Sequence, residues 1–183
     1  MTSAARRRRW IVFAVLAVGV LVADQLSKMW VDANFALAYP EPLPGYALPT
    51  PVIGDFVRIA KSYNSGVIFG LFDNSLPIPL LALASALVIA MIVLYHWREG
   101  LKSHWLLTVA LGLLLGGALG NLGDRINFGH VIDFVDMGIG TTRWYTFNVA
   151  DAAISTSLVL LIVIGLFGER LMRAAPEREL TPA

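Results

Sequence analysis

Residues Ser103–Gly123, SHWLLTVALGLLLGGALGNLG, form a run of 21 positions without Asp, Glu, Lys or Arg. An α-helix rises about 1.5 Å per residue, so roughly 20 apolar residues cross a hydrocarbon core of about 30 Å. Three further stretches also lack charge: Trp10–Ala23, Asn74–Trp97 and Ala152–Gly168. We therefore expect an all-α membrane protein with four transmembrane helices. These spans are predicted at about 10–30, 76–96, 104–122 and 150–169.

The composition agrees with this class. Of 183 residues, 57% are apolar and only 15% are charged, whereas a soluble domain has about 45–50% and about 25%. A net charge of +1 provides no basic field, so no nucleic-acid partner is expected. The absence of cysteine excludes disulfides, thiolate metal sites and cysteine nucleophiles. We expect one integral membrane domain over 1–183, with neither a metal nor an organic cofactor.

The first apolar stretch has a second interpretation. Arg6–Arg9 followed by 14 apolar residues, with Ala36-Leu37-Ala38 downstream, resembles a cleavable signal peptide. The cleavage site would lie well beyond the apolar run, after Asp24 and Lys28. A helix that continues to Trp30 instead brings these two charges together at i,i+4. We interpret the stretch as a membrane helix.

The distribution of basic residues predicts the orientation, because Lys and Arg accumulate on the cytoplasmic side. Four spans put both termini on one side, which then holds nine basic residues: Arg6–Arg9, Arg98, Lys102, Arg170, Arg173 and Arg178. The other side holds five: Lys28, Arg58, Lys61, Arg125 and Arg143. Both termini are thus expected in the cytoplasm, with extracytoplasmic segments at about 31–75 and 123–149.

Local patterns suggest what these outer segments contain. Five of the nine prolines lie within 40–51, which predicts an extended loop. Residues 56–72 show partial alternation and β-prone composition, which predicts a small extracytoplasmic sheet. The polar tail after Leu171 is expected to be disordered.

Four aspartates stand beside apolar spans on the outer side: Asp24, Asp124, Asp133 and Asp151. Ionisable groups at membrane depth are costly, so each is a functional hypothesis, and the alternative is an ion pair that holds helices together. Asp24 has Lys28 one turn later, and Asp124 directly precedes Arg125. We interpret both as mainly structural, with Arg125 compensating the charge of Asp124.

The other two acids have contrasting surroundings. Asn148 is a candidate N-cap, and Asp151 follows three residues later, where a helix N-terminus favours a negative charge. The alternative for Asp151 is a capping motif alone. Asp133 has apolar neighbours on both sides, and poor solvation there would raise its pKa. If the two meet, they form an acid–base pair able to activate water. Asp136, before a glycine-rich stretch, is interpreted as part of an exposed turn.

Glycines recur at a spacing of four along the third span. Gly112, Gly116 and Gly120 form the small-xxx-small pattern of closely packed membrane helices. We interpret them as packing positions.

Five blocks of this sequence, taken together and in order, resemble the signal peptidase II (lipoprotein signal peptidase) family. They are DQLSK at 24–28, YNSGVIF at 63–69, GGALGNLGDR at 116–125, VIDF at 131–134 and FNVAD at 147–151. Each block alone is modest evidence, whereas all five in register are highly specific. Tyr145-Thr146, where the family usually has a proline, and Val67-Ile68 depart from its pattern.

The resemblance implies a four-helix aspartyl endopeptidase of the bacterial cytoplasmic (inner) membrane. It would cut prolipoproteins just before a cysteine that carries a diacylglyceryl group. Asp133 and Asp151 match the family's catalytic aspartates. Residues that match its site-lining, supporting or further motif positions are Asn64, Gly66, Asn121, Arg125, Asn148, Asp24, Lys28 and Asp124. The family also has a β-cradle and a mobile loop, which would come from 31–75.

Two other function classes use the same features. A small proton- or cation-coupled transporter would use the aspartates, although the cytoplasmic halves of the spans have few polar residues. A membrane scaffold would pack through the glycine ridge, but it leaves the outer aspartates without a role. For the protease we expect membrane lipid and lipid-modified prolipoproteins as partners, and a monomer.

Overall fold

The computed structural model describes residues 3–38, 47–66, 77–100 and 104–173. Its helices are α1 (Ser3–Asn34), α2 (Ile78–Tyr95), α3 (Trp105–Phe128) and α4 (Val149–Arg173), and a short π-helical segment, η2 (His96–Gly100), follows α2. Within the described chain, four helices are long and apolar enough to cross a membrane. The prediction of four helices able to span a membrane is confirmed. The expected loop at 40–51, the β-prone stretch at 56–72 and the polar tail lie partly outside the described residues.

Helix α3 lies at the centre of the bundle. More than half of its most apolar window is buried, against less than a fifth in each of the other three helices. A Cβ atom at Gly116 would lie 2.6 Å from Ala17 O of α1, and one at Gly117 would lie 2.5 Å from Ala150 O of α4. Only glycine allows the backbones to approach this closely. The predicted packing role of the glycine ridge is thus confirmed, and Gly117 adds a second contact face.

Helix α3 is longer than its apolar stretch. It continues past residue 122 to Phe128 and ends at Gly129, whose φ of 75° is left-handed. The charged pair Asp124–Arg125 therefore lies within the helix, where buried partners satisfy it. Because strand β3 begins at Val131, this sharp C-terminal turn brings the strand directly to the end of α3.

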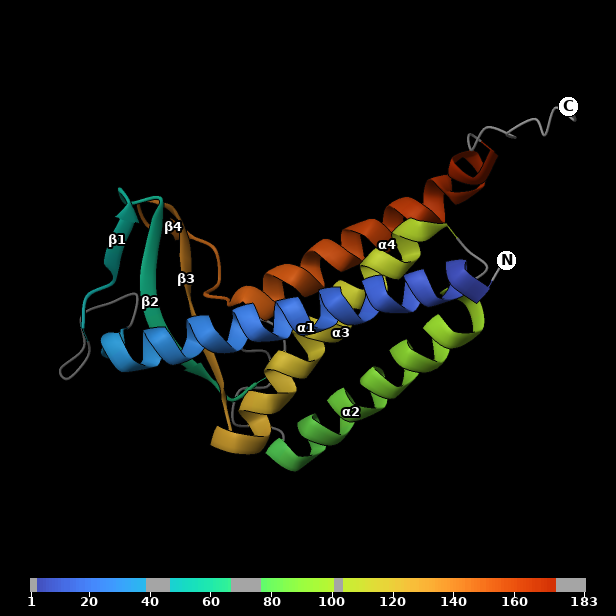
Figure 1. Cartoon of the computed structure of the whole chain (residues 1–183). Coiled ribbons are helices and arrows are strands. Elements are labelled where there is room, and N and C mark those ends of the chain that lie inside the picture. The colour runs from blue at the N-terminus through green and yellow to red at the C-terminus, as the bar shows by residue number, and fades with distance from the viewer. Residues whose placement is uncertain (1–2, 39–46, 67–76, 101–103, 174–183) are drawn as a thin grey trace, which may run out of the picture.

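The sheet has four antiparallel strands in the order β1-β2-β3-β4. The strands are β1 (Thr50–Ile53), β2 (Val57–Asn64), β3 (Val131–Ile139) and β4 (Thr142–Arg143). The predicted small sheet is confirmed, although β3 and β4 come from a segment where no strand was expected. In Figure 1 the sheet lies at one end of the bundle, and the start of α1 and the end of α4 lie at the other end.

The interpretation of Asp136 as an exposed turn residue is wrong. It lies in β3 with 5% of its surface exposed. Its carboxylate accepts hydrogen bonds from Arg58 Nε at 2.7 Å and from Arg143 Nε at 2.9 Å. The strand continues through Gly138 because β4 packs closely against that glycine. Asp136 therefore connects the two hairpins of the sheet.

Candidate active site

Strand β3 positions Asp133, and a β-bulge brings Asn64 to it. Ile59 pairs with Val135, but Ser62 pairs with Asp133; three steps along β2 thus match two along β3. The extra residue aligns Asn64 as the diagonal neighbour of Asp133 on the same face of the sheet. Asn64 Nδ2 donates a hydrogen bond of 3.0 Å to Asp133 Oδ2. The Asp133 side chain is buried, with 2% exposed.

The first turn of α4 positions Asp151. The Asp151 N–H donates to Asn148 Oδ1 at 2.9 Å, and the Asn148 N–H donates to Asp151 Oδ2 at 3.2 Å. This reciprocal arrangement is a capping box, as the three-residue spacing predicted. The other oxygen, Oδ1, accepts a bond of 2.8 Å from Asn121 Nδ2 of α3. Both carboxylate oxygens of Asp151 are thereby held in place.

Asn148 contacts both acids. Its side-chain Nδ2 donates to Asp133 Oδ1 at 2.7 Å, while its backbone N–H bonds Asp151. An antiparallel bridge between Val135 and Phe147 carries the chain before α4 alongside β3, which explains this proximity. The chain between the two acids thus folds back so that Asn148 contacts both of them.

Burial and mutual repulsion act on Asp133. The pKa of Asp133 is raised from 3.8 to about 7. Loss of hydration is the largest cause of this rise, and the neighbouring carboxylate of Asp151 is the second. The hydrogen bonds from Asn64 and Asn148 oppose this rise in pKa. The predicted direction of the Asp133 pKa and its cause, poor solvation, are confirmed. At neutral pH this carboxyl group is available as a proton donor.

Lys28, Asp24 and Asp124 form a buried charge cluster. Lys28 Nζ is 2.7 Å from Asp24 Oδ2 and 2.9 Å from Asp124 Oδ2. Asp24 Oδ1 also accepts the Ala150 N–H at 2.9 Å, and Asp124 Oδ2 accepts the Ile132 N–H at 3.2 Å. The structural interpretation of both aspartates fits these contacts. The cluster joins α1 and α3 to the start of α4 and to β3.

The expected partner of Asp124 was wrong. Its compensating cation is Lys28, not the adjacent Arg125. Arg125 instead donates from Nη2 to Gly66 O at 2.9 Å and from Nη1 to Asn121 O at 3.3 Å. Successive helical residues point about 100° apart, so neighbours in sequence face different surroundings. Gly66 in turn donates its N–H to Asn64 Oδ1 at 2.9 Å.

All ten candidate site residues therefore belong to one connected network of hydrogen bonds and ion pairs. Sequence reasoning did not single out Gln25, which also belongs to it. Its Nε2 donates to Asp124 Oδ1 at 2.8 Å and to Gly120 O at 3.2 Å. The available signal was its amide within an apolar span, since a buried amide requires partners. Among the described residues, no group of three or more His, Asp or Glu is placed to hold a metal.

The chain is similar in sequence to known signal peptidases. The family described as Signal peptidase (SPase) II matches residues 16–167. A lipoprotein signal peptidase of Moorella thermoacetica is 39% identical over 81% of this chain and 89% of the relative. One of Syntrophus aciditrophicus is 37% identical over 84% and 91%.

Solved structures show the same fold. A bacterial membrane enzyme determined by the in meso method at 2.3 Å resolution superposes with a TM-score of 0.73, at 24% identity, over 90% of this chain and 93% of that one. A second, at 1.9 Å resolution, has a TM-score of 0.70 and 25% identity over 84% and 92%. The arrangement of helices and sheet is therefore shared with experimentally determined membrane enzymes.

Proposed function

The chain belongs to the signal peptidase II family, and we propose that Asp133 and Asp151 are the acids with which it removes signal peptides from prolipoproteins. One observation carries this assignment. A single residue, Asn148, donates to Asp133 from its side chain and to Asp151 from its backbone. Two carboxyl groups with one shared neighbour and different surroundings form the kind of pair that performs acid and base roles together.

The reaction follows from the two environments. Asp151, which receives bonds at the N-terminus of α4, acts as the ionised base and takes a proton from water. Asp133, with its raised pKa, is protonated and donates a hydrogen bond to the scissile carbonyl oxygen. The water oxygen then bonds to the carbonyl carbon. When the C–N bond breaks, the proton passes to the leaving amine. Coupled carboxyl groups titrate as a pair, so the reactive state is the singly protonated pair.

We assign contact with the substrate backbone to Asn64, Gly66 and Arg125. The guanidinium of Arg125 bonds Gly66 O, and Gly66 N–H bonds Asn64 Oδ1. These contacts hold the peptide segment that follows β2 against the end of α3. The mobile loop implied by the resemblance was expected from residues 31–75, and residues 39–46 and 67–75 of that stretch lie outside the described residues.

The bilayer supplies the remaining specificity in this proposal. Large apolar side chains such as Val15, Leu87 and Val159 are exposed on the outer faces of the helices, where lipid would cover them. The diacylglyceryl chains of a modified precursor would lie in the same lipid. This would bring the bond before the modified cysteine to the acids at the membrane surface. The enzyme would act as a monomer.

We further propose that both termini are cytoplasmic and that the sheet and the site are extracytoplasmic, in the bacterial inner membrane. The start of α1 and the end of α4 share one end of the bundle (Figure 1), and the basic residues predicted for that side outnumber the others nine to five. Because the chain has no cysteine, single S3C and I139C variants can be labelled in intact cells. A membrane-impermeable maleimide should label I139C and not S3C. Labelling of S3C alone would mean that the protein has the opposite orientation.

The test of the acid pair uses the purified full chain and a diacylglyceryl-modified precursor. D133N and D151N should each lower the rate of signal-peptide release by about 10²–10⁴-fold, the usual contribution of a general acid or base. D32N is the matched control: Asp32 pairs with Lys61 at 3.1 Å, away from the two acids, and its variant should cleave at the parental rate. Thermal unfolding verifies that all variants fold.

The assignment fails if a folded D133N or D151N variant retains a tenth or more of the parental rate. The transporter hypothesis gains no support from the comparisons, all of which lead to peptidases or membrane enzymes. Signal-peptide release by the parent protein in detergent, without a closed membrane, separates proteolysis from transport directly.

A further inference from the structure

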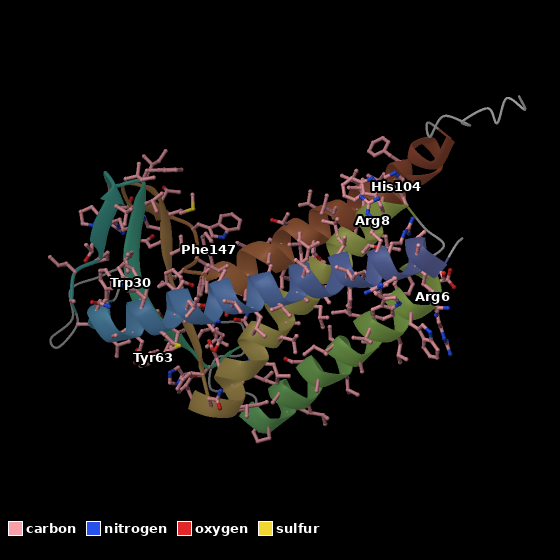
Figure 2. The ribbon with its side chains drawn as sticks, in the orientation of Figure 1. Arg6, Arg8, Trp30, Tyr63, His104 and Phe147 are labelled. Atoms are coloured by element: carbon pink, nitrogen blue, oxygen red, sulfur yellow. The ribbon has the colours of Figure 1, made fainter. Side chains whose placement is uncertain are left out.

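Two buried carboxylates each bind the backbone N–H that lies one residue before a proposed catalytic acid. Asp24 Oδ1, on α1, accepts the N–H of Ala150 at 2.9 Å, directly before the acid of α4. Asp124 Oδ2, on α3, accepts the N–H of Ile132 at 3.2 Å, directly before the acid of β3. Figure 2 shows Phe147 between the sheet and the start of α4, where the chain passes from one to the other. The chain is therefore held by the helix bundle next to each acid.

Gln25 of α1 connects these two carboxylates to each other. Its Nε2 donates to Asp124 Oδ1 at 2.8 Å and to Asp24 Oδ2 at 3.3 Å. Lys28 lies three residues later, on the same face of the helix, and its Nζ is 2.7 Å from Asp24 Oδ2 and 2.9 Å from Asp124 Oδ2. One amide and one ammonium group thus determine where the carboxylate of α1 lies relative to that of α3.

We call the four side chains of Gln25, Lys28, Asp24 and Asp124 the clamp. The two carboxylates and the ammonium group are each at most 2% exposed. Because water cannot replace a partner at such a depth, each contact within the clamp is costly to lose. A Cβ atom at Gly120 of α3 would lie 2.5 Å from Asp24 Oδ2, so the backbone of α3 also limits the movement of this carboxylate. The clamp is therefore a fixed unit between α1 and α3.

We propose that Gln25 is a positioning residue, which through the clamp sets the separation of Asp133 and Asp151. This inference rests on the proposed function of the two acids. When the clamp carboxylates move apart, the start of α4 moves relative to β3, and Asn148 loses one of its bonds to the two acids. A displacement of about 1 Å can cost on the order of 10²-fold in rate. Gln25 thus acts on the reaction without contacting the substrate.

The experiment measures kcat and KM of the purified full chain on a diacylglyceryl-modified precursor. Q25M keeps the side-chain length and every charge but removes the amide donor, and its kcat should fall about 10- to 100-fold. Its KM should stay within about twofold of the parental value, because the bonds of Gln25 lead to Asp24, Gly120 and Asp124. S27A is the matched control. Ser27 Oγ donates to the backbone oxygen of Asp24 within the same helix at 2.8 Å, and S27A should cleave at the parental rate.

Two further measurements distinguish positioning from general stabilisation. If Gln25 acts through the acid pair, adding Q25M to D151N should lower the residual rate by less than about twofold, because the pair is already broken. A pair of glycine variants perturbs the clamp without removing a donor. G120A places a Cβ atom 2.5 Å from Asp24 Oδ2 and should also lower kcat, whereas G123A meets nothing within 4 Å and should not. Thermal unfolding verifies that each variant folds, and G120A decides the test if Q25M does not.

Three outcomes would overturn the proposal. A parental kcat in folded Q25M would mean that the amide does not position the acids. A raised KM with an unchanged kcat would mean that Gln25 serves substrate binding. Equal fold-losses from Q25M in the parent and in D151N would mean a general structural role. If Q25M is fully active while D133N and D151N are not, only this inference fails, whereas full activity of D133N or D151N contradicts the proposed function itself.

Discussion

The ammonium group of Lys28 donates a hydrogen bond of 2.9 Å to Oδ1 of Asn121. Lysine can only donate, so this contact determines which end of the Asn121 amide is oxygen. The nitrogen end must then face Asp151, to which it donates at 2.8 Å. A buried cation on α1 thus sets the direction of a hydrogen bond to an acid on α4.

The charge cluster around Lys28 should govern stability. K28M would leave Asp24 and Asp124 buried without a cation, and loss of one partner from a buried pair costs about 3–5 kcal/mol. We expect this decrease in the free energy of unfolding in micelles. The triple variant D24N/K28M/D124N, in which no uncompensated charge remains, should recover a large part of it. Equal stability of K28M and the parent would contradict the cluster's role.

The pKa of Asp133 predicts the pH dependence of cleavage. If protonated Asp133 donates to the scissile carbonyl, the rate is sustained below its pKa of about 7. It should fall about tenfold for each further unit of pH above that value. Initial rates on a lipid-modified precursor between pH 5 and pH 9 test this, with thermal unfolding measured over the same range. A rate that stays constant to pH 9 would mean that Asp133 is not the acid.

The same pKa predicts how stability depends on pH. Asp133 has a pKa of about 7 in the folded chain against 3.8 for a free side chain. The folded state therefore binds more protons between these values, and stability falls as pH rises through this window. At about 1.4 kcal/mol per unit of pH, the whole interval corresponds to on the order of 4 kcal/mol.

Residue 133 cannot titrate in D133N, which should therefore reduce this slope, whereas D32N should retain it. Chemical unfolding at pH 4, 5.5 and 7 measures the difference. If D133N shows the same decline as the parent, another group causes it.

The glycines of α3 allow a matched test of helix packing. A Cβ atom at Gly116 would meet Ala17 O at 2.6 Å and Val20 Cβ at 2.7 Å, whereas one at Gly123 meets nothing within 4 Å. G116A should therefore force α1 and α3 apart and cost about 1–3 kcal/mol, the usual penalty for overpacking. G123A should be neutral or slightly stabilising, because alanine favours a helix. Similar melting temperatures for both variants would contradict the observed contact.

Several features were predictable from the sequence because their causes are local. A helix crosses a bilayer when about 20 neighbouring residues are apolar, and Ser103–Gly123 meets that condition without reference to any other segment. The capping box of Asn148 and Asp151 depends on residues three apart. The apolar neighbours of Asp133 predicted the direction in which its pKa is raised, because they indicated a poorly hydrated carboxyl group.

Other features depend on residues far apart along the chain. The exposed turn expected for Asp136 was wrong because Arg58, 78 positions away, pairs with it across the sheet. Lys28 rather than Arg125 compensates Asp124 for a similar reason, since α1 packs against α3 through the glycine ridge. The bulge in β2, which aligns Asn64 with Asp133, depends on strand register and has no clear local signature.

The amino-acid sequence alone determined that this chain forms apolar helices with acids near their ends, because solvation and helix capping act over a few adjacent residues. The tertiary structure decided which acid meets which partner and that Asn148 contacts both Asp133 and Asp151. Electrostatic and hydrogen-bond partners are selected by distance in space. That distance is set by the packing of α1, α3 and α4 and by the register of β2 on β3.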